Sequence, residues 1–130
     1  MTTTTGTTLT ALTTAMFSVR DQDAALAFYT GVLGFEVRAD LRFGEHDEYR
    51  WLEVAPPGSA ARLALNPPMG GEPSPSAIGV DSTDVLAEHA RLAARGDVEV
   101  GPTPTRSPGA PLMFSVSDPD GNTVWIVGRD

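Results

Sequence analysis

The stretch MFSVRDQDAALAFYTGVLGFEV, residues 16–37, decides the fold because it carries the signals of three successive elements. Thr13–Val19 alternates and is rich in β-prone residues, which predicts a strand. Asp21 and Asp23 are typical helix-start residues, and the apolar positions after them recur at helical spacing. That predicted helical face consists of Ala25, Phe28, Tyr29, Val32 and Leu33. Gly34 ends the helix, and Phe35–Leu41 is predicted to be the next strand.

The same order of elements occurs a second time further along the chain. Two strands, Tyr49–Val54 and Arg62–Leu65, complete the first half, with a turn at Pro56-Pro57-Gly58-Ser59 between them. The second half begins with a strand at Ser76–Val80 and a helix that starts after Asp84. Its remaining predicted strands are Val98–Val100, Leu112–Val116 and Thr123–Val127, the last two joined by the turn Asp118-Pro119-Asp120-Gly121-Asn122.

This order is an internal repeat, and it fixes the domain organisation. Met16-Phe17-Ser18-Val19 corresponds to Ala77-Ile78-Gly79-Val80, and an aspartate follows at the same distance in each half. We expect a flexible threonine-rich tail at 1–12, a first βαβββ module at 13–66, a linker at 67–75 and a second βαβββ module at 76–128. One such module leaves a bare sheet face, so the two modules should pair into a single α+β domain.

Several segments resemble the vicinal-oxygen-chelate superfamily of glyoxalases, bleomycin resistance proteins and extradiol dioxygenases. Val19–Tyr29 followed by Val32-Leu33-Gly34-Phe35 is similar to the opening of these proteins, and Arg50–Gly58 resembles a strand and turn of a glyoxalase-like branch. Ala93–Gly96 and Asp118–Asn122 resemble the second-half signatures, so the resemblance covers about residues 13–128. It implies two βαβββ modules with a cavity between curved mixed sheets, but it leaves the substrate open because one fold hosts many chemistries.

The resemblance also indicates where metal-using members of the superfamily carry their ligands. The corresponding positions here are Thr14, Ala64, Pro75 and Trp125, which together offer a single weak hydroxyl donor. A divalent cation needs three or four imidazole, carboxylate or thiolate donors. His46 lies in a polar loop, and His89 lies in the apolar stripe of the second helix, where a structural role is expected. We therefore expect no metal site and no cofactor.

Strand alternation predicts which side chains could contact a ligand. If the aliphatic set that includes Phe17, Leu52 and Val124 faces the helices, the opposite face mixes large aromatic, methionine and small polar side chains, as ligand sites do. An alternative reading is a half-solvated sheet or a dimer interface. Two tryptophans in this set favour a ligand or partner. The candidate ligand-binding residues are Thr14, Met16, Tyr49, Trp51, Arg62, Met113, Ser115 and Trp125.

Composition excludes several classes of function. The formal net charge of −8 argues against nucleic-acid binding, which requires clustered basic groups. No apolar run is long enough to span a membrane, so no membrane partner is expected. The chain contains no cysteine, which excludes disulfides and a cysteine nucleophile and fits a cytoplasmic location.

The sequence favours a metal-independent protein that binds or sequesters a small aromatic or amphipathic molecule, and a homodimer is expected. A metal-free isomerase or lyase with Glu53 as its base, assisted by Arg62 or Tyr49, is the alternative. Glu53 and Arg62 are also predicted to lie on neighbouring strands, where they could form a structural ion pair. A metal-dependent glyoxalase or dioxygenase and a non-catalytic assembly module are the remaining hypotheses.

Overall fold

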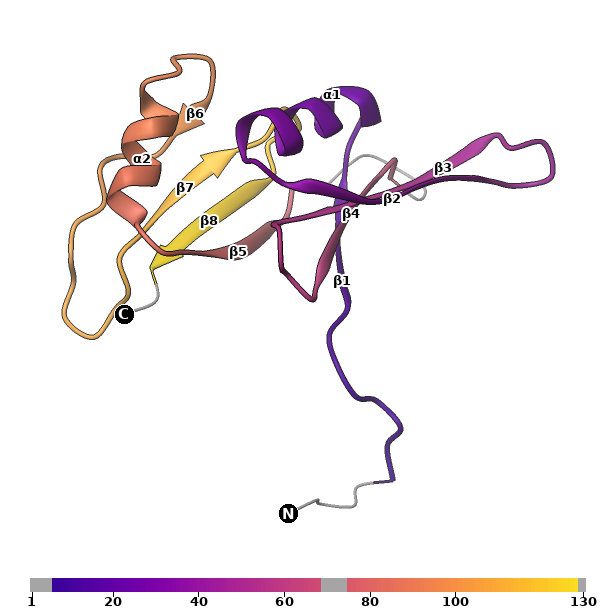
Figure 1. The fold of residues 1–130 in the computed structure, drawn as a ribbon, viewed down its shortest axis with the longest axis horizontal. Coiled ribbons are helices and arrows are strands. Elements are labelled where there is room, and N and C mark those ends of the chain that lie inside the picture. The colour runs from indigo at the N-terminus through magenta and orange to yellow at the C-terminus, as the bar shows by residue number, and fades with distance from the viewer. Residues whose placement is uncertain (1–5, 69–74, 129–130) are drawn as a thin grey trace.

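The computed structural model describes residues 6–68 and 75–128, and it contains two mixed four-stranded sheets (Figure 1). The first half comprises β1 (Thr14–Ser18), α1 (Gln22–Ala27), η1 (Phe28–Val32), β2 (Glu36–Phe43), β3 (Tyr49–Ala55) and β4 (Arg62–Asn66). The second half comprises β5 (Ala77–Ser82), α2 (Val85–Ala93), β6 (Glu99–Val100), β7 (Met113–Ser117) and β8 (Thr123–Gly128). Residues 1–5 of the predicted tail and 69–74 of the predicted linker lie outside the described residues.

The two halves have the same topology, which confirms the predicted repeat and the α+β architecture. Sheet A has the strand order β1-β4-β3-β2, and sheet B has the order β5-β8-β7-β6. In each sheet the first and last strands of the module pair in parallel, whereas the other neighbours are antiparallel. Each sheet therefore has its helix on one face and leaves the other face open.

The first helix differs from the single regular helix that the apolar spacing predicts. Asp21 caps α1 by accepting a hydrogen bond from the Ala24 amide at 3.0 Å, but the chain widens into a π-helix from Phe28 onward. The Leu33 amide then reaches the Phe28 carbonyl at 3.2 Å. This wider turn buries Phe28, Tyr29 and Val32 together, and a strict helical period could not anticipate it.

One hydrophobic core serves both modules. It joins the helix-facing residues of sheet A, such as Phe17 and Leu52, to those of sheet B, such as Phe114 and Val124. Strand alternation predicted this division of side chains, and both α1 and α2 contribute to the same cluster. The open faces of the two sheets therefore lie outside this core.

A buried polar network connects the modules beside that core. The Tyr29 hydroxyl donates to Asp118 Oδ2 at 2.9 Å, and Asn122 Nδ2 donates to the Ser18 carbonyl at 3.2 Å. Asp118 also accepts the backbone amides of Asp120 and Asn122 at 2.9 and 2.8 Å. The Asp118–Asn122 turn thus closes the β7–β8 hairpin and contacts the first module.

Asp84 caps α2, and its removal should have a measurable effect on stability. Its Oδ1 accepts the Ala87 amide at 3.0 Å. Replacing Asp84 by alanine is expected to lower the free energy of unfolding by about 1 kcal/mol because that amide loses its partner. Urea denaturation of Asp84→Ala and Asp84→Asn checks this. The asparagine variant keeps the acceptor, so equal losses from both substitutions would contradict the capping role.

No helix in residues 6–68 and 75–128 is long and apolar enough to span a membrane.

Candidate functional site

The open face of sheet A carries the five predicted ligand-binding residues of the first module. The register pairs Thr14 with Arg62, Met16 with Ala64, and Ala64 with Glu53. Met16 is 61% exposed and Tyr49 58% exposed, while Trp51 is half-buried. Ala64 is fully covered, so it leaves no space for a ligand. The alternation of the strands therefore brings Thr14, Met16, Tyr49, Trp51 and Arg62 onto one surface.

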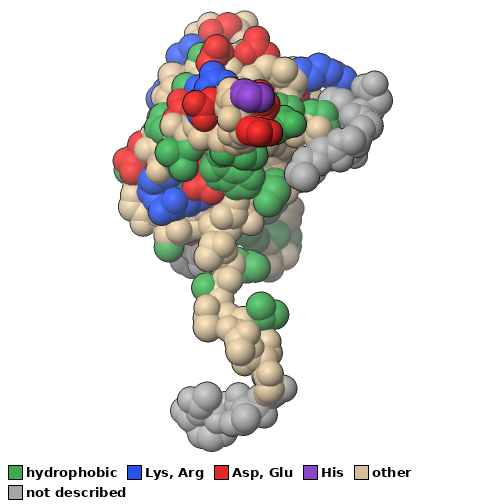
Figure 2. Space-filling model, turned by 90° about the vertical axis from the view of Figure 1, so that its right-hand side faces the viewer, with side chains coloured by type: hydrophobic (Ala, Val, Ile, Leu, Met, Phe, Trp, Pro, Cys, Tyr) green, Lys and Arg blue, Asp and Glu red, His purple; other side chains and the backbone are tan. Residues whose placement is uncertain are grey.

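The β2–β3 hairpin adds two residues to this surface that the sequence analysis missed. Leu41 pairs with Trp51, and Phe43 pairs with Tyr49, with the two aromatic rings 5.3 Å apart. Leu41 and Phe43 are 61% and 48% exposed. Seen from this end, hydrophobic side chains gather next to the acidic residues and a histidine at the hairpin tip (Figure 2). The alternation of Leu41 and Phe43 with charged neighbours was the signal that could have identified them.

Glu53 is the buried polar centre of this face. It is 7% exposed, and its two carboxylate oxygens are both engaged. Trp51 Nε1 donates to Oε2 at 2.9 Å, and Arg62 Nη1 donates to Oε1 at 3.1 Å. The ion pair considered for Glu53 and Arg62 is present, and Glu53 holds the indole as well. With both oxygens occupied, Glu53 acts as an orienting group in this arrangement.

The open face of sheet B carries the remaining candidates. Trp125 is 40% exposed and pairs with Gly79 on one side and Ser115 on the other. Met113 is 39% exposed, and Ser115 is half-buried. A Cβ added at Gly79 would meet nothing within 4 Å, so the space beside the indole is open. The structure thus places Trp51 and Trp125 on different sheets.

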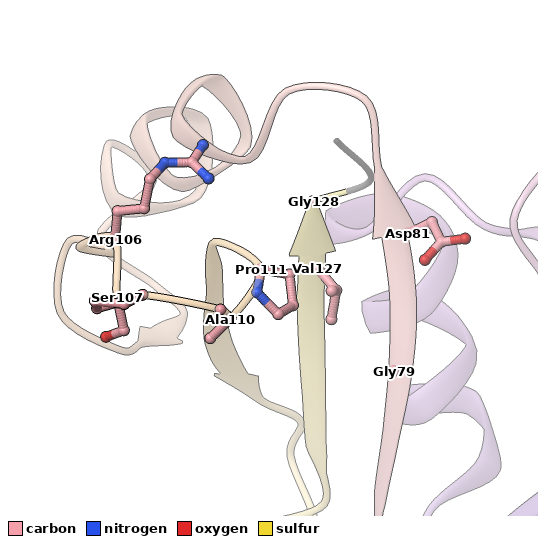
Figure 3. Close-up of a pocket in the computed structure, with 10 residues that line it drawn as sticks. Gly79, Asp81, Arg106, Ser107, Ala110, Pro111, Val127 and Gly128 are labelled. Carbon is pink, nitrogen blue, oxygen red and sulfur yellow. The ribbon is translucent and has the colours of Figure 1, made fainter.

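Two pockets lie next to these faces. One, of about 920 Å³, is lined by the open-face residues Gly79, Asp81 and Val127 and by the loop from Arg106 to Pro111 (Figure 3). In that view the Asp81 side chain is directed away from the loop. The other, of about 660 Å³, lies between the modules and includes Ala15, Arg62 and Val80 in its lining. Neither tryptophan lines either pocket.

The positions that hold a metal ion elsewhere in the superfamily do not fit one here. Thr14 pairs with Arg62, Trp125 pairs with Gly79, Ala64 is covered, and Pro75 lies two residues before β5. A threonine hydroxyl beside alanine, proline and tryptophan does not provide the donor set that a divalent cation requires. Residues 6–68 and 75–128 contain no group of three or more histidine, aspartate or glutamate residues arranged to hold a metal ion.

The two histidines lie away from the candidate site. His89 Nε2 lies 2.9 Å from the Gly101 carbonyl oxygen, and its ring packs edge-on against Phe114, which supports the expected structural role. His46 is exposed in the loop between β2 and β3.

The main ion-pair network of sheet A lies on the helix side. Arg50 donates to both Asp40 oxygens and to Asp23. These hydrogen bonds from Arg50 lower the pKa of Asp40 and keep it ionised. The network ties β3 to β2 and α1, and it leaves the open face free of these charges.

Comparisons with known proteins agree with this architecture. The profile of the Glyoxalase/Bleomycin resistance protein/Dioxygenase superfamily matches residues 11–126. Over 111 residues the chain is 32% identical to the uncharacterized protein YetH of Bacillus subtilis (strain 168), covering 83% of this chain and 89% of that protein.

Solved structures give a similar result. The crystal structure of TnmS3, an antibiotic binding protein from Streptomyces sp. CB03234, is 32% identical with a TM-score of 0.82, covering 95% of this chain and 99% of that one. A superfamily member from Sphaerobacter thermophilus DSM 20745 is 30% identical with a TM-score of 0.82, covering 93% of this chain and 98% of that one. These structures share the fold over almost the full length of each chain.

Proposed function

The chain belongs to the Glyoxalase/Bleomycin resistance protein/Dioxygenase superfamily, and from this premise we propose that it binds a small aromatic or amphipathic molecule without a metal ion, as a sequestration or resistance protein. The observation that carries the proposal is the pair of open sheet faces, each with a tryptophan beside other apolar side chains. The antibiotic-binding role of the similar TnmS3 supports the same class of function.

Each open face alone is too exposed to enclose such a ligand. Ligand sites bury most of the surface of a drug-sized molecule, whereas Met16, Tyr49 and Leu41 on sheet A are all more than half exposed. The exposed apolar positions on sheet A have counterparts in Met113 and Trp125 on sheet B. We therefore propose a homodimer in which sheet A of one protomer faces sheet B of its partner, with the ligand between Trp51 and Trp125.

Alanine substitution of the tryptophans tests both parts of the proposal. We expect Trp51→Ala and Trp125→Ala each to weaken binding of 2-naphthamide about tenfold, because each removes an aromatic surface on which the probe stacks. Isothermal titration calorimetry measures the affinity. Leu86→Ala, which removes an apolar side chain that is 53% exposed on α2, is the matched control and should leave it unchanged.

Mixing the two tryptophan variants distinguishes a site within one chain from a site between two chains. After unfolding and refolding together, mixed dimers should hold one site with both tryptophans, so about a quarter of all sites should regain the original affinity. A site within one chain would regain none, which would overturn the dimeric arrangement. Unchanged affinity in both single variants would overturn the proposed binding site itself.

A further inference from the structure

We propose that the open face of sheet A selects aromatic ligands that carry a negative charge, with Arg62 as the anion anchor beside Trp51. The inference rests on the proposed function, since it names the ligand class of the same site. It follows from how one buried carboxylate holds two side chains, from the donors that remain on Arg62, and from the charge of the chain as a whole.

Glu53 fixes the relative positions of an aromatic ring and a cation. Its Oε2 accepts Trp51 Nε1 at 2.9 Å, and its Oε1 accepts Arg62 Nη1 at 3.1 Å. Because the carboxylate is 7% exposed, both hydrogen bonds are shielded from water and hold their geometry. The indole and the guanidinium are therefore both anchored to one carboxylate before any ligand arrives, which reduces the entropic cost of binding.

Arg62 retains donors for a ligand after binding Glu53. Its side chain is 47% exposed, and within residues 6–68 and 75–128 only Nη1 donates a hydrogen bond. A guanidinium has five N–H donors in a planar fork, and that fork matches a carboxylate with two parallel hydrogen bonds. The Nε and Nη2 groups of Arg62 can therefore bind an anionic substituent of the ligand.

The Glu53 side chain is less accessible to a ligand than that of Arg62, with 9% of it exposed against 47%. Both of its oxygens are covered by their donors, so an incoming group meets the guanidinium first. The chain as a whole carries a formal net charge of −8, so it repels anions unless a local cation offsets that charge. Arg62 is the cationic residue that contacts Glu53, the carboxylate that also holds the Trp51 indole. An aromatic acid would thus stack on Trp51 and place its charge at Arg62.

The test compares 2-naphthoate with 2-naphthamide, which has nearly the same shape and no charge. We expect the protein to bind the naphthoate about tenfold more tightly in calorimetric titrations. Arg62→Met should remove that preference, measured as the ratio of the naphthoate and naphthamide affinities. Arg62→Lys should retain part of the preference, because lysine keeps the positive charge without the guanidinium fork. Arg42→Met is the matched control. Arg42 lies on the opposite face of sheet A, where it is the strand neighbour of Arg50, and its replacement changes the net charge by the same amount.

The outcomes separate this inference from the proposed function. Equal binding of the two probes by the unmodified protein, or a preference that survives Arg62→Met, would overturn the anion anchor and leave aromatic binding intact. An equal loss of preference in Arg42→Met would also overturn it, because the effect would then follow net charge. Failure of both probes to bind would overturn the proposed function. Circular dichroism shows whether each variant is folded. If Arg62→Met does not fold, Arg62→Lys supplies the test.

Discussion

Asp118→Ala is expected to lower the free energy of unfolding by about 3–5 kcal/mol, the largest loss expected of the substitutions considered for this protein. Asp118 is 5% exposed and accepts four hydrogen bonds, from the Tyr29 hydroxyl, Asn122 Nδ2 and the amides of Asp120 and Asn122. Replacing Asp118 by alanine leaves the buried Tyr29 hydroxyl and the side-chain Nδ2 donor of Asn122 without this acceptor. Such donors cost about 1–3 kcal/mol each when they lose their partner.

Urea denaturation at neutral pH measures this loss, and a neighbour in the same turn provides the control. Within the described part of the chain, the Asp120 carboxylate accepts one hydrogen bond, from the Arg20 amide to Oδ1 at 3.0 Å. Asp120→Ala should therefore cost about 1 kcal/mol or less. Equal destabilisation by both substitutions would mean that stability follows the total charge of the turn. The hydrogen-bond network around Asp118 would then not be the cause of the loss.

The protein should also lose stability steadily above pH 10, and Tyr29 is the expected cause. Burial raises the pKa of the Tyr29 phenol, and the nearby Asp118 carboxylate raises it further by its charge and hydrogen bond. In the unfolded chain a tyrosine titrates near pH 10. Above that pH the unfolded state loses this proton while the folded state keeps it. Each further pH unit therefore lowers the free energy of unfolding by up to about 1.4 kcal/mol.

Tyr29→Phe should remove this alkaline dependence. At pH 8 we expect the variant to be less stable than the unmodified protein by about 1.5–3 kcal/mol, because a hydrogen bond to a charged acceptor is lost. The difference should narrow as the pH rises from 10 to 12. Urea denaturation at each pH unit from 8 to 12 measures this difference in stability. The chain contains no lysine, so no lysine side chain titrates in this range. A constant difference across the series would argue against Tyr29 as the titrating group.

Much of the fold could be predicted because local and repeated signals agree. The strands alternate cleanly, Asp21 and Asp84 cap their helices, and the matching order of the two halves fixes one topology for both. The Glu53–Arg62 pair followed from two positions on the same face of adjacent strands. These features depend on residues that are close in sequence or lie on adjacent strands, which the periodicity of apolar residues describes well.

The rest depends on tertiary geometry that periodicity does not contain. The π-helix at Phe28–Val32 accompanies the burial of Phe28, Tyr29 and Val32 in the shared core. The hydrogen bond from Trp51 to Glu53 depends on side-chain rotamers, and the position of Trp51 relative to Trp125 depends on how the modules pack. The extension of β2 to Phe43 follows from its pairing with Tyr49.

The network around Asp118 has a consequence for the two halves of the chain. Tyr29 supplies the hydroxyl from the first half, and Asp118 and Asn122 supply the acceptor and the amide from the second. Although the halves follow one plan, these parts are not duplicated: the position that corresponds to Asp118 and Asn122 in the first half is the turn at Pro56–Ser59. A chain made of two copies of one half would lack either the Tyr29 hydroxyl or its Asp118 acceptor, so the two halves are complementary and cannot replace each other.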